Sequence, residues 1–212
     1  MAGKKKFERK VFKDLIRDAI YEAIINEELK PGDRIVEMEW AERFSASQAP
    51  VREAIRDLEA RGIVASIPFK GSFVREMTEQ QIEDVHEVRA GLETVALNQA
   101  MDKATEEQIR DLHHHLEEMF EAAKDGDEKF FMESDIKFHE TIVDMADTTD
   151  LKKLWNMCNI RFWTEVCTKH SDKELQALAE FHVPVYEALV NKDSEHAYKT
   201  MREHFHNVSQ YK

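Results

Sequence analysis

The chain has 212 residues, of which 42% are hydrophobic and 34% are charged, and its formal net charge is −13. This composition is typical of a globular chain with a hydrophobic core, and the presence of only 6 Gly and 4 Pro argues against long loops and β-rich architectures. No run approaches the roughly 20 apolar residues that a membrane-spanning helix needs, and only 2 cysteines occur. We therefore expect no membrane span and no disulfide framework, and we expect the protein to be cytoplasmic.

The charge is divided unevenly along the chain. Residues 1–75 contain 15 Lys and Arg against 13 Asp and Glu, a net charge of +2, whereas the remainder has 15 against 30, a net charge of −15. A weakly basic N-terminal part can approach a nucleic acid that the acidic remainder would repel. An uneven spread of solvated charge is the alternative interpretation, and the charge count alone does not decide between the two.

Residues 1–76 predict a winged helix-turn-helix domain. Apolar residues recur at helical spacing over about 11–26, a short helix follows at about 37–44, and a third helix runs from about 48 to 61. Gly62 then suits the position that ends this helix. Two segments of β-forming residues, "IVASIP" and "GSFVRE", flank the turn "FKG" and predict a small β-hairpin.

Residues 77–212 predict an all-helical bundle of about six helices, so the fold class is mainly α. Thr105 with Gln108 forms a capping box that marks one helix start, and Pro184 should bend the fifth helix. The predicted helices begin at 78 and then span about 105–124, 127–146, 150–168, 172–191 and 193–210.

The third helix of the first domain carries the candidate DNA-reading residues. In a helix-turn-helix the second helix of the motif enters the major groove by its N-terminal end. Here that end carries Ser47, Gln48 and Ala49, and Arg52 follows one turn later on the same face as Gln48. Gln pairs with adenine and Arg with guanine, so this helix end can read bases. A surface helix with ordinary solvated arginines is the alternative.

The tip of the hairpin is the second candidate contact with DNA. Lys70 and Gly71 lie there, where a cation and a small residue can contact a phosphate or enter the minor groove. The whole stretch "SQAPVREAIRDLEARGIVASIPFKGSFV" resembles the signature of GntR-type transcription regulators. The shared residues are Ser47, the run Pro-Val-Arg-Glu-Ala at 50–54, Leu58, Gly62, Val64, Gly71 and Val74.

This resemblance implies a DNA-binding homodimer that recognises a palindromic operator. Gln48 and Ala49 depart from the family pattern, which usually has Arg and Thr at these two positions. The operator sequence of the family therefore does not transfer to this chain, and Gln48 would shift the preferred base from guanine toward adenine.

The helical domain contains a candidate metal site. Asp135 and His139 lie at i and i+4 within "ESDIKFHE" and therefore share one helix face, where they can share one metal ion. His182 and His204 lie on later helices, and helix bundles can build metal sites in their cores from residues on several helices. Spacing alone does not select these two residues from the 10 histidines of the chain.

A second resemblance makes that selection. Residues 78–210 are similar to the FCD ligand-sensing domain of FadR-like GntR regulators, which has an Asp-x-x-x-His pair followed by two later histidines. The resemblance implies that Asp135, His139, His182 and His204 hold a divalent transition metal such as Zn²⁺ or Ni²⁺. It also implies that Arg89, in "VRAGLE", binds a small carboxylate effector.

The sequence therefore predicts a ligand-responsive transcription regulator, most simply a repressor, and not an enzyme. Two alternatives stay open. Three imidazoles and one carboxylate with an open coordination position could activate water, as in a metal-dependent hydrolase. The metal could instead be structural and join three helices. The absence of a general base beside the proposed ligands, and the presence of a winged helix, argue against the hydrolase.

Overall fold

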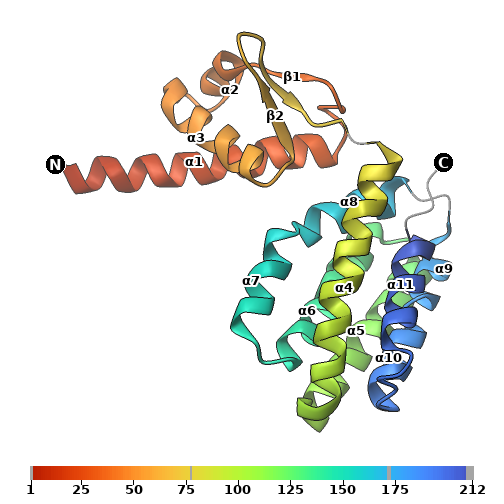
Figure 1. Ribbon diagram of the computed structural model, residues 1–212. Helices are drawn as coiled ribbons and strands as arrows, with labels where there is room; N and C mark the ends of the chain where they lie inside the picture. Colours follow the sequence, from red (N-terminus) through yellow and green to blue (C-terminus); the bar gives the residue numbers. More distant parts are fainter. Residues whose placement is uncertain (1, 77, 171–172, 209–212) are drawn as a thin grey trace. The chain divides into compact units, whose positions relative to one another are not determined.

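The computed structural model describes residues 2–76, 78–170 and 173–208. The chain divides into two compact units, of which the first ends at Thr78 and the second begins at Glu79 (Figure 1). Among the described residues, no helix combines the length and the apolar character that crossing a membrane requires.

The first unit contains the three helices that the sequence predicts. They are α1 (Ala2–Ile25), α2 (Glu37–Arg43) and α3 (Gln48–Ala60). Helix α3 packs against both α1 and α2, because its apolar residues recur at helical spacing and form one buried face. The buried residues of α3 are Pro50, Val51, Ala54, Ile55 and Leu58.

The predicted hairpin is confirmed, and a third strand extends it. Strands β2 (Val64–Ile67) and β3 (Gly71–Val74) pair antiparallel, with Val64 opposite Val74. Strand β1 (Arg34–Ile35) pairs with the other side of β3, which gives the sheet order β1-β3-β2. A strand of 2 residues shows no alternation that sequence reasoning could detect.

The second unit is a helical bundle, as predicted (Figure 1). Helix α4 packs along α6 and α11, and α5 packs along α6 and α9. The capping box of Thr105 and Gln108 is confirmed at the start of α5. The helices are α4 (Glu79–Lys103), α5 (Glu106–Asp125), α6 (Glu128–Met145), α7 (Thr149–Met157), α8 (Ile160–His170), α9 (Leu175–Glu180), α10 (Val183–Val190) and α11 (Ala197–Val208).

Two predicted helices are each broken into two shorter ones. The segment predicted at 150–168 breaks between α7 and α8 at Asn159, whose φ of 50° is left-handed and cannot continue a right-handed helix. The segment predicted at 172–191 breaks between α9 and α10, where Pro184 in the first turn of α10 has no backbone N–H to donate. Residues 171 and 172, at the predicted start of that segment, lie outside the described residues.

A buried ionisable ring packs between two helices of the bundle. His86 of α4 is 3% exposed and stacks on the ring of Phe205 of α11, with the two ring centroids 5.8 Å apart. Burial, together with the nearby Arg89 guanidinium, lowers the pKa of His86 to about 3, while Glu93 opposes this effect. His86 is therefore a neutral ring in the folded protein across the physiological pH range.

The pKa of His86 predicts how the stability of the second unit depends on pH. An unfolded chain protonates this histidine below its ordinary pKa of 6.5, whereas the folded ring stays neutral down to about 3. Lowering the pH through this window should therefore remove stability, by up to about 1.4 kcal/mol per pH unit for this group. We expect the free energy of unfolding of His86→Phe, measured by urea unfolding with a chelator present, to fall less steeply than that of the wild type as the pH is lowered. His113→Phe, at a half-exposed position, is the control, and its free energy of unfolding should fall with pH as the wild type's does. Equal pH dependence in all three proteins would contradict the role assigned to His86.

Candidate functional site

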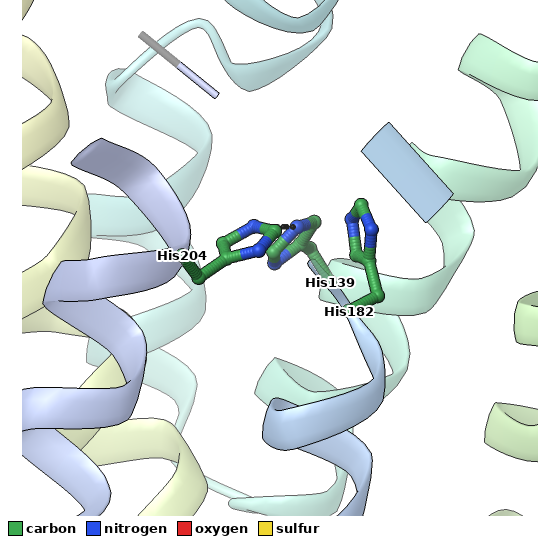
Figure 2. Close-up of side chains that lie close together, drawn as sticks. All are labelled: His139, His182 and His204. Atoms are coloured by element: carbon green, nitrogen blue, oxygen red, sulfur yellow. Dashed lines mark hydrogen bonds between the residues drawn. The ribbon is translucent and has the colours of Figure 1, made fainter. Parts of the chain in front are cut away.

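Four of the predicted site residues come together inside the second unit. Asp135 and His139 project from α6, His182 is the N-cap residue of α10, and His204 lies on α11. All four are buried, since the most exposed of them, Asp135, is 8% exposed. Figure 2 shows the three rings grouped at one point, and one ring nitrogen from each lies within 4.8 Å of the others.

The outward-facing nitrogen of each ring fixes how that ring is protonated. Each Nδ1 contacts an oxygen that can only accept a hydrogen bond, so each neutral ring carries its proton on Nδ1. This leaves a lone pair on each Nε2, on the side of the cluster. The pairs are His182 with the Leu178 carbonyl at 2.9 Å, His204 with the Phe181 carbonyl at 3.1 Å, and His139 with the Glu93 carboxylate.

The inward-facing atoms are all electron donors. The Nε2 atoms of His139 and His204 are 3.2 Å apart. His182 Nε2 lies 2.9 Å from Asp135 Oδ1, but among the described residues this buried nitrogen makes no hydrogen bond of good geometry. Lone pairs at these distances repel unless a positive charge lies between them. The donor set of three imidazoles and one carboxylate therefore fits a divalent transition metal such as Zn²⁺, Ni²⁺ or Co²⁺.

The protonation states of the cluster also suit a metal. Burial alone would raise the pKa of Asp135, but the hydrogen bond and positive charge that a protonated His182 supplies, with the charges of His139 and Arg89, hold it well below its ordinary value. Burial, together with the two other rings, holds the pKa of His204 well below its ordinary value. At neutral pH the carboxyl is therefore ionised and the His204 ring neutral, which are the forms that bind metals.

Arg89 lies beside this cluster with an unused donor. It is 3% exposed, and its guanidinium carbon is 4.4 Å from the centroid of the Phe205 ring, which in turn stacks on His139. Its Nε donates to Glu93 at 3.3 Å, whereas its buried Nη2 has no hydrogen-bond partner among the described residues. A buried guanidinium N–H without a partner is a donor available to an anion.

Glu93 is the site residue that sequence reasoning missed. It is fully buried and accepts hydrogen bonds from His139 Nδ1 and, at 2.9 Å, from Trp155 Nε1. Burial alone would raise the pKa of Glu93, but His139 and Arg89 lower it, so the carboxyl is ionised. Its position four residues after Arg89 is the one signal in the sequence, because the metal-ligand pattern lies on later helices.

The candidate DNA-reading residues lie together at the start of α3. Ser47 and Gln48 are exposed and Ala49 is half-buried. The Arg52 side chain is 57% exposed, and its guanidinium donates to Glu37 at 2.6 Å and to Gln48 at 3.0 Å. Glu37, on α2, was not predicted; it holds the arginine at the helix end, where base edges would approach.

The hairpin tip carries the remaining candidates. Lys70 and Gly71 are exposed, and Phe69 before them is fully exposed. The φ of Gly71 is 110°, which favours glycine, and a side chain there would lie 3.1 Å from Nε of Arg34. Arg34, on β1, thus adds a second cation near the tip, and it was missed because its short strand was not predicted.

Comparison with known proteins identifies the two units. A model of the FCD domain matches residues 84–207, and a model of the bacterial regulatory proteins of the gntR family matches residues 12–74. A probable D-xylose utilization operon transcriptional repressor of Paenarthrobacter nicotinovorans is 31% identical over 203 residues, covering 96% of this chain and 89% of that protein. The gluconate operon transcriptional repressor of Bacillus subtilis is 27% identical over 191 residues, covering 87% of this chain and 78% of that protein.

A solved structure has the same fold. A putative GntR transcriptional regulator from Rhodococcus sp. RHA1 superposes with a TM-score of 0.73 at 21% identity, covering 93% of this chain and 95% of that one. The family consists of transcription regulators and not enzymes, which argues against the hydrolase alternative. Because both family models match and one relative aligns with 96% of this chain, the chain belongs to the GntR family of bacterial transcription regulators and carries an FCD domain.

Proposed function

We propose that this chain is a metal-containing repressor that binds a palindromic operator as a homodimer and responds to a small organic acid. The observation that carries the proposal is the convergence of four buried electron donors beside an arginine that has an N–H without a hydrogen-bond partner among the described residues. The names of the relatives support repression, since two of them are described as operon repressors. One of these is named for gluconate, which is an organic acid of the expected class.

Asp135, His139, His182 and His204 would hold the metal. When bound, a divalent cation would act as a Lewis acid toward an oxygen of the effector, at a coordination position that the protein leaves open. The outer partners of the histidines keep their donor atoms turned inward, as the partners of metal-binding histidines do. The metal is then part of the effector pocket in addition to joining three helices.

Arg89 would bind the carboxylate of the effector. Its Nη2 is buried and has no hydrogen-bond partner within the described ranges, so an incoming carboxylate gains a charge-assisted hydrogen bond without displacing a protein group. The Phe205 ring under the guanidinium fixes the plane in which that bond forms. For the effector to change operator binding, it must bind the DNA-competent and DNA-incompetent arrangements with different affinities.

Removing the charged ligand tests the metal site. We expect Asp135→Asn, which keeps the side-chain size, to bind Zn²⁺ or Ni²⁺ at least about 100-fold more weakly than the wild type, since an outer partner alone changes affinity by 10- to 100-fold. Asp144→Asn is the matched control, because this residue is on the same helix but pairs with Lys152 at the surface. Competition with a chromophoric chelator measures the three affinities, and equal affinities in all three proteins would contradict the proposed metal site.

The effector site has its own test. A thermal-shift screen of sugar acids and dicarboxylates against the metal-loaded protein should yield a compound that raises the melting temperature, because a ligand at 100 times its Kd stabilises by about 2.7 kcal/mol. Arg89→Lys keeps the charge but lacks the planar fork, and we expect it to lose most of that shift. A compound that stabilises wild type and Arg89→Lys equally would place the effector elsewhere.

Operator binding tests the N-terminal unit. On a duplex selected in vitro from random sequences, Arg52→Ala should lose about 1–3 kcal/mol of binding free energy if this side chain reads a base. Arg61→Ala removes the same charge at the opposite end of α3 and should lose less. Fluorescence anisotropy at one fixed salt concentration measures both, and an unchanged affinity in a folded Arg52→Ala protein would contradict the assignment.

A further inference from the structure

We propose that Glu93 is a positioning residue that orients His139 toward the metal and links it to Arg89. The inference rests on the proposed metal and effector site and names a residue outside that ligand set. Glu93 ends the segment "VRAGLE" that also carries Arg89, but it is neither a proposed metal ligand nor the proposed contact to the effector. It would act through the two residues that have these roles.

The contacts of Glu93 connect three helices. From α4, its Oε2 accepts from His139 Nδ1 on α6, and its Oε1 accepts from Trp155 Nε1 on α7 at 2.9 Å. The same Oε1 lies 3.3 Å from Arg89 Nε, one turn earlier on α4. One oxygen therefore serves the proposed metal ligand, and the other serves the proposed effector-binding arginine.

A carboxylate at this place is costly for stability alone. Glu93 is 0% exposed to solvent and lies in the low dielectric of the interior. Burying an ion there costs several kcal/mol before its partners compensate. An apolar residue of similar size often stabilises a core equally well or better. The charge therefore has a consequence that packing does not explain: it holds the proton of His139 on Nδ1 and makes the inward Nε2 a stronger electron donor.

The shared carboxylate also couples the two ligands. When an anion binds Nη2 of Arg89, it takes part of the positive charge that now faces Glu93. Glu93 is then freer to polarise His139, and metal binding strengthens. Because coupling between two binding sites is reciprocal, the metal must strengthen anion binding by the same factor.

The test uses the full chain and Co²⁺ as the probe, since its visible spectrum reports the ligands directly. Glu93→Gln keeps the volume and removes the charge, whereas Glu93→Asp keeps the charge and removes a methylene. We expect Glu93→Gln to bind Co²⁺ about 10- to 100-fold more weakly, with an altered spectrum. Asp193→Asn is the matched control, because Asp193 also contacts a histidine Nδ1, that of His196, but at the surface; it should match the wild type.

The outcomes separate the positioning role from packing and from the metal site itself. If Glu93→Gln binds like the wild type while Glu93→Asp is weakened, Glu93 only fills space and the proposal is overturned. If the wild type itself takes up no Co²⁺, the metal site fails and the role of Glu93 fails with it. In the double variant with Arg89→Gln, the two fold-changes should not multiply, and simple multiplication would overturn the link to Arg89.

A second measurement needs no variant and covers the case in which Glu93→Gln does not fold. Long-range nitrogen–proton correlation spectra of metal-free wild-type protein at mildly alkaline pH distinguish the two neutral forms of each imidazole. We expect His139 to carry its proton on Nδ1, opposite Glu93. A proton on Nε2 would overturn the proposal.

Discussion

The second unit depends on how the electrostatics of four buried donors are balanced. Each neutral histidine ring donates a hydrogen bond from Nδ1 to an outer acceptor, so three Nε2 lone pairs and one carboxylate oxygen face the same small volume. Without a positive charge these atoms repel in a medium of low dielectric. A divalent cation, as proposed above, would convert the repulsion into attraction and would join α6, α11 and the start of α10. The free energy of binding such a metal would then contribute to the free energy of folding of this unit.

The same constraint explains why the effector and the metal would act together. Arg89 and Glu93 occupy successive turns of α4, the first helix after the DNA-binding unit in the chain. The arginine offers a donor to an anion, and the glutamate connects it to the proposed metal ligand His139. Ligand binding would thus alter contacts of α4 with α6 and α7.

The sequence predicts the frame of this arrangement better than its details. Helical periodicity and the two β-forming segments around the turn "FKG" predicted the winged helix and the bundle, because amphipathic segments specify their own buried faces. Spacing paired Asp135 with His139, but only family resemblance selected His182 and His204. Glu93 was not predicted as a site residue, because its contacts depend on packing against α6 and α7 that no local sequence pattern encodes. The helix break at Asn159 was not predicted, because no glycine or proline in the sequence marks this left-handed position.

X-ray absorption spectroscopy on the metal-loaded protein tests the central claim most directly. We expect the atoms coordinated to the metal to be nitrogen and oxygen only, with a Zn–N distance of about 2.0–2.1 Å and the more distant scattering of several imidazole rings. The convergence of His139, His182 and His204 on one point requires that all three rings contribute. A shell that contains sulfur, or one that shows a single imidazole or none, would contradict it.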